Sequence, residues 1–120
     1  MTINDKKIQR GLIITPRWLE KILSGEKTLE MRTRPTKIRG WIALIESGAG
    51  LIMGITKLVS CTGPMTLELL QKCRNAHCID YDQQPDLERY KFAWTINFTQ
   101  KLESPVPYRH PKGAVVWVKL

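Results

Sequence analysis

The chain has 120 residues, of which 42% are hydrophobic and 25% are charged, and this composition excludes general disorder. No apolar run reaches the roughly 18–20 residues that a membrane-spanning helix needs, and residues 1–10 lack a secretory signal pattern, so a cytoplasmic protein without membrane contact is expected. Nineteen Lys and Arg residues against eleven Asp and Glu residues give a net charge of +8, which favours an anionic partner.

The first half of the chain predicts short strands around one helix. Residues 1–10 are expected to form a flexible segment, and the β-branched run at 11–15 predicts a strand. Pro16 suits the first turn of a helix that has Thr15 as its N-cap and ends at Gly25. Further strands are predicted over residues 27–33, 41–46 and 51–59, and the turn between the last two makes them a hairpin.

The second half predicts one more helix and two more strands. The helix runs over residues 66–74 with Thr66 as its cap, and residues 78–86 are irregular. A strand over 92–98 follows from strict alternation, the prolines of 105–111 indicate an extended loop, and the last strand covers 114–120. The whole chain, 1–120, is therefore expected to be a single α+β domain. Its centre is a small, mostly antiparallel β-barrel of about six strands, flanked by two or three helices.

One segment concentrates residues suited to chemistry, namely residues 24–33 (SGEKTLEMRT). On a strand, alternate side chains share a face, so Glu30 and Arg32 lie side by side. A carboxylate next to a guanidinium forms a charge-assisted pair. Lys27 lies just past the helix cap, where local twist can direct its amine toward the same cleft.

These residues carry a resemblance to a known family. Gly25, Lys27, Glu30 and Arg32 match the pattern Gly-x-Lys-x-x-Glu-x-Arg, which is similar to the signature of the ASCH family, a branch of the PUA-like fold. A strand and a Trp-containing helix precede the signature, and segments 90–94 and 105–117 resemble the closing strands of small ASCH proteins. The likeness spans roughly residues 11 to 120.

The resemblance implies a PUA-like barrel whose cleft is lined by the signature residues and binds RNA or a nucleotide. It also implies two enzymatic alternatives known among small members, a ribonuclease and an amidohydrolase that deacetylates N4-acetylcytidine. In the amidohydrolase pattern the catalytic Lys falls at Lys27, whereas the Thr nucleophile falls at Glu30. No Glu matches the third catalytic residue, and Asp80 is the nearest acid. Lys27 and Glu30 remain catalytic candidates, as a pair for proton transfer or for positioning.

Other residues are candidates for RNA contact. Arg32, Arg34, Lys37 and Arg39 form a basic segment that suits phosphate contacts, or else a solvated charged loop. Trp18 either stacks on a base or fills the core, and Thr15 either caps its helix or also lines the cleft. Glu46 either points into the barrel mouth or ends its strand in solvent.

Neither a metal nor another cofactor is expected. The three cysteines are odd in number, and Cys73, His77 and Cys78 match no metal-ligand spacing and lack a second ligand pair. Two functions therefore stay open, which are binding of RNA or a nucleotide and metal-independent hydrolysis of RNA or an acetylated cytidine. The oligomeric state does not follow from the sequence.

Overall fold

The structure, a computed structural model, describes all 120 residues. The strands are β1 (Thr2–Ile3), β2 (Lys6–Lys7), β3 (Arg10–Ile14), β4 (Leu29–Arg32), β5 (Gly40–Glu46), β6 (Leu51–Thr62), β7 (Phe92–Pro107) and β8 (Trp117–Lys119). The helices are α1 (Pro16–Leu23), α2 (Leu67–Lys72) and α3 (Arg74–His77), and η1 (Pro85–Arg89) is a short 3-10 helix. None of the helices has both the length and the apolar character needed to cross a membrane.

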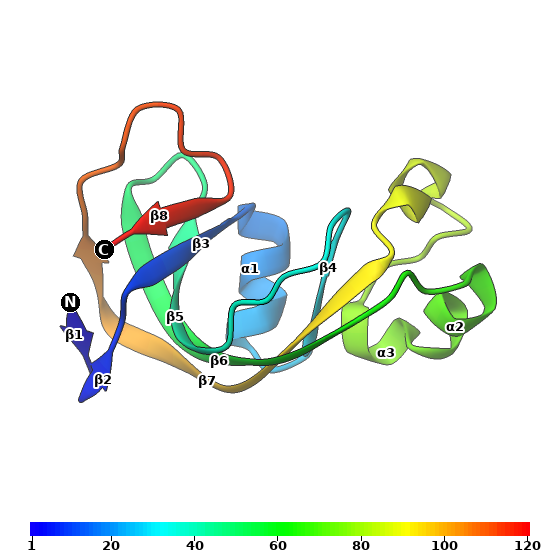
Figure 1. The fold of residues 1–120 in the computed structure, drawn as a ribbon, viewed down its shortest axis with the longest axis horizontal. Helices are drawn as coiled ribbons and strands as arrows, with labels where there is room; N and C mark the ends of the chain where they lie inside the picture. Colours follow the sequence, from blue (N-terminus) through cyan, green and yellow to red (C-terminus); the bar gives the residue numbers. More distant parts are fainter.

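Six strands form one curled sheet in the order β4-β7-β6-β5-β3-β8, as predicted for a small, mostly antiparallel α+β fold. Only β3 and β5 run parallel, and every other neighbouring pair is antiparallel. The edge strands β4 and β8 do not pair with each other, so the barrel is half open. The long strands β6 and β7 run through the whole molecule (Figure 1), and three register shifts between them bend the sheet.

The core consists of three buried clusters spread along the molecule. One surrounds Ile8 and Ile45 near the chain termini, and a second packs Leu19 and Ile22 of α1 against the sheet. The third lies beneath α2 and α3, around Leu70. The helices α2, α3 and η1 thus form a lobe at the end of the molecule opposite the β1–β2 hairpin (Figure 1).

The N-terminal segment departs from its expected flexibility. Residues 1–10 contain an antiparallel hairpin in which Ile3 pairs with Lys6. Asn4 and Asp5 form its two-residue turn with φ of 48° and 65°, a conformation that these two residue types tolerate well. Ile3 and Ile8 then enter the core, with exposed fractions of 7% and 1%, and this burial holds the segment in place.

The remaining elements match the predictions in kind but differ in extent. Thr66 caps α2 as predicted, its hydroxyl accepting from the Leu69 amide at 3.2 Å, but the helix breaks at Cys73 and resumes as α3. Strand β7 continues past the predicted end at Phe98 to Pro107, because its final residues pair with the start of β6. Phe98 itself has φ of 55° and marks an irregularity in this strand.

Candidate functional site

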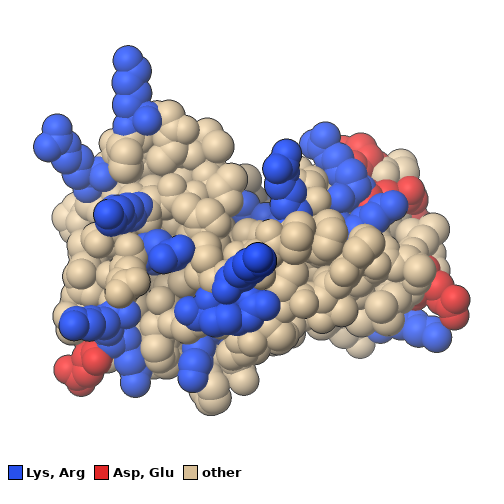
Figure 2. Space-filling model, in the orientation of Figure 1, with Lys and Arg blue, Asp and Glu red and all other residues tan.

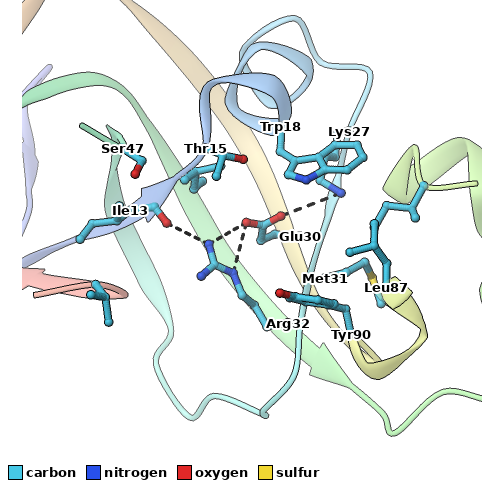
Figure 3. A pocket seen from close by; sticks show the side chains of 13 residues that line it. Ile13, Thr15, Trp18, Lys27, Glu30, Met31, Arg32, Ser47, Leu87 and Tyr90 are labelled. Carbon is cyan, nitrogen blue, oxygen red and sulfur yellow. Dashed lines mark hydrogen bonds and ion pairs between the residues drawn. The ribbon is translucent and has the colours of Figure 1, made fainter. Parts of the chain in front are cut away.

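A cavity of about 250 Å³ opens at the carboxyl ends of β3 and β5, beside β4 (Figure 3). Members of all three core clusters contribute to its walls, as does the η1 segment of the helical lobe. Its lining consists of Ile13, Ile14, Thr15, Trp18, Lys27, Glu30, Met31, Arg32, Ser47, Ile79, Leu87, Tyr90 and Val115. The charged residues among these are Lys27, Glu30 and Arg32, and the other side chains are mostly apolar.

The charged side chains form one connected group (Figure 3). Glu30 Oε2 accepts from Arg32 Nη2 at 2.8 Å and from Arg32 Nε at 3.2 Å. The other carboxylate oxygen, Oε1, lies 3.9 Å from Lys27 Nζ. Glu30 is 4% exposed, and its buried carboxylate is balanced by the cations of Lys27 and Arg32. One carboxylate and two cations give the group a net charge of +1.

Local structure explains how Lys27 reaches this group. Helix α1 ends at Leu23, and Gly25, two residues later, has a φ of +87°, a left-handed conformation that favours glycine. The chain then turns, and the backbone of Thr28 donates to Ala76 of α3 and accepts from Ile96 of β7. Lys27 is thereby fixed between the helical lobe and the sheet, and its side chain is 1% exposed.

The Lys27 amine is surrounded by electron-rich groups. It donates to the His77 carbonyl at 2.5 Å and lies 4.9 Å from the centre of the Trp18 ring, an arrangement that stabilises an ammonium. Burial acts more strongly in the opposite direction and lowers the pKa of Lys27 to about 8, although Glu30 partly offsets this shift. The amine is therefore mostly protonated at pH 7 but has a usable neutral fraction.

Arg32 is fixed by several contacts, but some of its N–H donors do not bind any protein group. Besides its bonds to Glu30, Nη2 donates to the Ile13 carbonyl at 3.0 Å, and the guanidinium lies 5.6 Å from the Trp94 ring. The second amino group, Nη1, makes no hydrogen bond to the protein. A guanidinium fixed in this way offers a directed donor pair to a ligand oxygen or nitrogen.

His77 provides the backbone carbonyl that accepts from Lys27, and its buried ring fixes the local backbone. Its ring is completely buried, Nδ1 accepts from the Ile79 amide at 2.9 Å, and Nε2 donates to the Leu70 carbonyl at 2.5 Å. Burial lowers the pKa of His77 below its usual 6.5, so the ring is neutral with its proton on Nε2. Both ring nitrogens are thus engaged by the backbone, and the role of His77 is to orient the carbonyl that receives Lys27.

The sequence model of the ASCH domain matches residues 12–106, which is most of the chain. The chain belongs to the ASCH family. A comparison with curated proteins gives no match. Solved structures with the same fold include the ASCH protein of Zymomonas mobilis, which has a TM-score of 0.71 and 16% identity over 92% of this chain and 86% of that one. Two mutant forms of that protein also match. One mutant has a TM-score of 0.70 and 16% identity over 92% of this chain and 87% of that one. The other mutant has a TM-score of 0.71 and 17% identity over 95% of this chain and 91% of that one.

In this ASCH domain, five of the nine predicted site residues line one cavity. They are Thr15, Trp18, Lys27, Glu30 and Arg32. Thr15 occupies the N-cap position of α1, but its side chain makes no capping hydrogen bond. Trp18 is half-buried, with part of its ring in the cavity wall, so it contributes to the core and to the cavity at once.

The other four predicted residues lie outside the cavity. Arg34 is exposed on the connection between β4 and β5, and Lys37 and Arg39 line a separate groove farther along this connection. Glu46 lines a third, shallow depression over α1, because the strand ends there and only the next residue, Ser47, turns into the cavity. Asp80, the nearest acid to the missing catalytic Glu, pairs with Arg74 at 2.9 Å and also lies outside the cavity.

The apolar wall was not predicted from the sequence. Ile79 and Tyr90 flank η1 between α3 and β7, Leu87 lies in η1 itself, and Val115 comes from the β7–β8 connection. Neither segment has a periodic pattern that indicates which side chains point inward. Tyr90 had one available signal, because it begins the 90–94 segment that resembles the family.

Proposed function

We propose that this ASCH domain binds RNA or a nucleotide by holding one nucleobase in the cavity. The observation that carries the proposal is the convergence of Lys27, Glu30 and Arg32 on one opening with apolar walls. A flat base has polar edges and apolar faces. The walls suit its faces, and the charged group supplies both donors and a fixed acceptor for its edges.

Two further features support an RNA-related ligand over a neutral metabolite. The charged group in the cavity retains a net charge of +1, and the whole chain carries +8, so a phosphate attached to the base is attracted rather than repelled. Trp18 presents part of an aromatic ring, and stacking of a base on such a ring contributes about 1–3 kcal/mol.

The test is calorimetric titration of the protein with the four ribonucleoside monophosphates and with a short single-stranded RNA. We expect Arg32→Gln to weaken binding about tenfold or more, because a charge-assisted hydrogen bond contributes about 1.5–3 kcal/mol. Lys112→Gln removes one exposed charge that does not line the cavity and serves as the matched control. Equal affinities for the two variants, each verified as folded by circular dichroism, contradict the proposal.

Hydrolysis is a second candidate function, and one observation favours it. Burial brings the pKa of Lys27 to about 8, close to the value at which an amine accepts a proton efficiently near neutral pH. For an acetylated cytidine, the neutral amine of Lys27 takes a proton from water while the water oxygen bonds to the acyl carbon. The carbon–nitrogen bond then breaks, the proton passes to the leaving exocyclic nitrogen, and the products are acetate and cytidine. The free Arg32 donors would stabilise the oxyanion that develops on the acyl oxygen.

Lys27→Arg separates hydrolysis from binding. Arginine retains the positive charge but does not release a proton in this range. We expect this variant to bind cytidine nucleotides and to lose turnover of acetylated cytidine and of RNA, whereas the wild-type rate rises with pH and levels off above about 8. Undiminished turnover by Lys27→Arg in a product assay would exclude Lys27 as the base.

A further inference from the structure

A second concave surface lies at the end of β3 and β5 opposite the cavity. This groove has a volume of about 510 Å³ and is lined mostly by polar and basic residues. The lining residues are Lys7, Gln9, Arg10, Lys37, Ile38, Arg39, Trp41 and Ile42. They come from the N-terminal hairpin, the start of β3 and the segment that leads into β5, so three separate parts of the chain build it.

The groove carries cations that no acid neutralises. Lys7, Arg10, Lys37 and Arg39 line it, Lys6 lies beside it with its amine 5.0 Å from the Trp41 ring, and none of the five forms an ion pair. Figure 2 shows many Lys and Arg side chains across the middle and left of the visible face, whereas most of the visible acids lie at the helical end. Unpaired cations on a concave surface create a potential that attracts a polyanion.

Part of this basic surface is held in a defined shape. Arg39 Nη1 donates to the carbonyls of Thr36 and Ile38 at 2.9 and 2.7 Å, which fixes the guanidinium and leaves other donors free. The hairpin packs on the core through Ile3 and Ile8, which positions Lys6 and Lys7. A preformed site loses less conformational entropy on binding than a flexible tail.

One basic segment connects the groove to the cavity. Arg32 lines the cavity at the end of β4, and the chain then passes through exposed Arg34 to Lys37 and Arg39 in the groove. Trp94 Nε1 donates to the Arg34 carbonyl at 3.0 Å and anchors this connection to the sheet. Strand β3 joins the two sites directly, and its four residue steps span about 13 Å. A single-stranded RNA of several nucleotides can therefore reach from the groove to the cavity.

We propose that the groove binds the phosphates of a single-stranded RNA, while another nucleotide farther along the same RNA occupies the cavity. This inference rests on the proposed function of the cavity and adds to it a substrate class, namely an RNA strand rather than a free nucleotide. The cations come from separate segments of the chain around an open groove, which suits successive phosphates of a backbone better than the compact phosphate of one nucleotide.

The test measures affinity for single-stranded RNAs of 1, 4 and 12 nucleotides by fluorescence anisotropy at several salt concentrations. Lys7→Gln/Lys37→Gln removes two cations from the groove, and Lys101→Gln/Lys112→Gln removes two exposed cations that line neither the groove nor the cavity. We expect wild-type affinity to increase with length. The groove variant should bind the 12-mer about tenfold more weakly, with a salt slope lower by about 1.4, and bind the mononucleotide normally.

Other outcomes separate this inference from the function proposed for the cavity. If the protein binds nucleotides but length has no effect, or if both double variants weaken the 12-mer equally, the groove has no specific role and the cavity proposal stands. If neither RNA nor any nucleotide binds, both proposals fail. If polyglutamate displaces the 12-mer as well as RNA does, the groove recognises charge alone and the assignment to RNA is overturned. Crosslinks from a 4-thiouridine 12-mer should map to residues 33–41 as well as to the cavity.

Discussion

Glu30 is the residue on which the charge balance of the site depends. It is 4% exposed and is the one acid in contact with both Lys27 and Arg32. Glu30→Gln keeps the size of the side chain but leaves two cations close together with no anion. We expect a loss of about 3 kcal/mol in the free energy of unfolding, the cost of removing one partner from a buried ion pair. Urea unfolding at pH 7 measures it.

A second substitution tests whether the loss arises from the cations. Lys27→Met removes the more deeply buried cation, so the double variant Lys27→Met/Glu30→Gln should be more stable than Glu30→Gln alone. If the double variant is no more stable than Glu30→Gln alone, the loss does not arise from the unpaired cations and the account of a connected group is wrong.

The sequence predicted the polar part of this site better than the apolar part. Strand alternation places Glu30 and Arg32 on one face, and their observed pairing confirms the prediction. The position of Lys27 in the same cavity follows from the turn at Gly25. By contrast, the carbonyl that receives the Lys27 amine belongs to His77, fifty residues away, and no local pattern encodes a contact of that kind.

At the scale of elements, the N-terminal hairpin is the clearest test of what holds the fold together. Ile8 is 1% exposed and belongs to the core cluster that contains Ile45 and Ile52. Ile8→Ala should lower the free energy of unfolding by about 2–3 kcal/mol, because it removes buried methyl groups and leaves a cavity. Thr2→Ala, on an exposed position of β1, is the control and should change stability by less than about 0.5 kcal/mol. A hairpin that is flexible in solution would make the two variants equal.

The predicted elements agree with the structure where the local sequence pattern determines the conformation. They differ from it where pairing between distant strands determines where a strand ends. The hairpin of β5 and β6 follows from two β-branched runs around a Gly-rich turn, and it is present. From sequence, Pro105 and Pro107 predict a loop where the structure has the end of β7. Proline is tolerated at strand ends, and there the chain pairs with Leu51 and Ile52. The Asn4–Asp5 turn carried a usable hairpin signal, but strands of two residues are too short to show alternation.

At the scale of the whole molecule, three buried titratable groups shape the dependence of stability on pH. The pKa of His77 is lowered from 6.5 and that of Lys27 from 10.5 to about 8, in both cases chiefly by burial. Burial raises the pKa of Tyr81 from 10.0 to about 12, and its hydroxyl donates to the Tyr90 carbonyl at 3.0 Å. A group that binds protons more weakly when folded makes stability rise with pH between its two pKa values, and a group that binds them more strongly makes it fall.

As the pH increases, the free energy of unfolding should therefore rise in two steps and then decline. The first rise lies below about pH 6.5, where the unfolded chain protonates His77 and the folded chain does not. The second lies between about pH 8 and 10, where folded Lys27 has lost its proton and unfolded Lys27 still holds it. This rise amounts to about 2 kcal/mol, since each unit of difference contributes about 1.4 kcal/mol. Above about pH 10 the unfolded chain releases the Tyr81 proton first, so stability falls.

Denaturant midpoints measured from pH 5 to 11 test this curve, and Lys27→Met identifies its origin. The variant has no amine to desolvate, so it should lose the rise between pH 8 and 10 while keeping the rise below pH 6.5 and the fall above pH 10. At pH 7 it should be at least as stable as the wild type, because methionine fills the same space without a buried charge. A rise between pH 8 and 10 that persists in Lys27→Met would place the titrating group elsewhere and remove the physical basis for a reactive amine in the cavity.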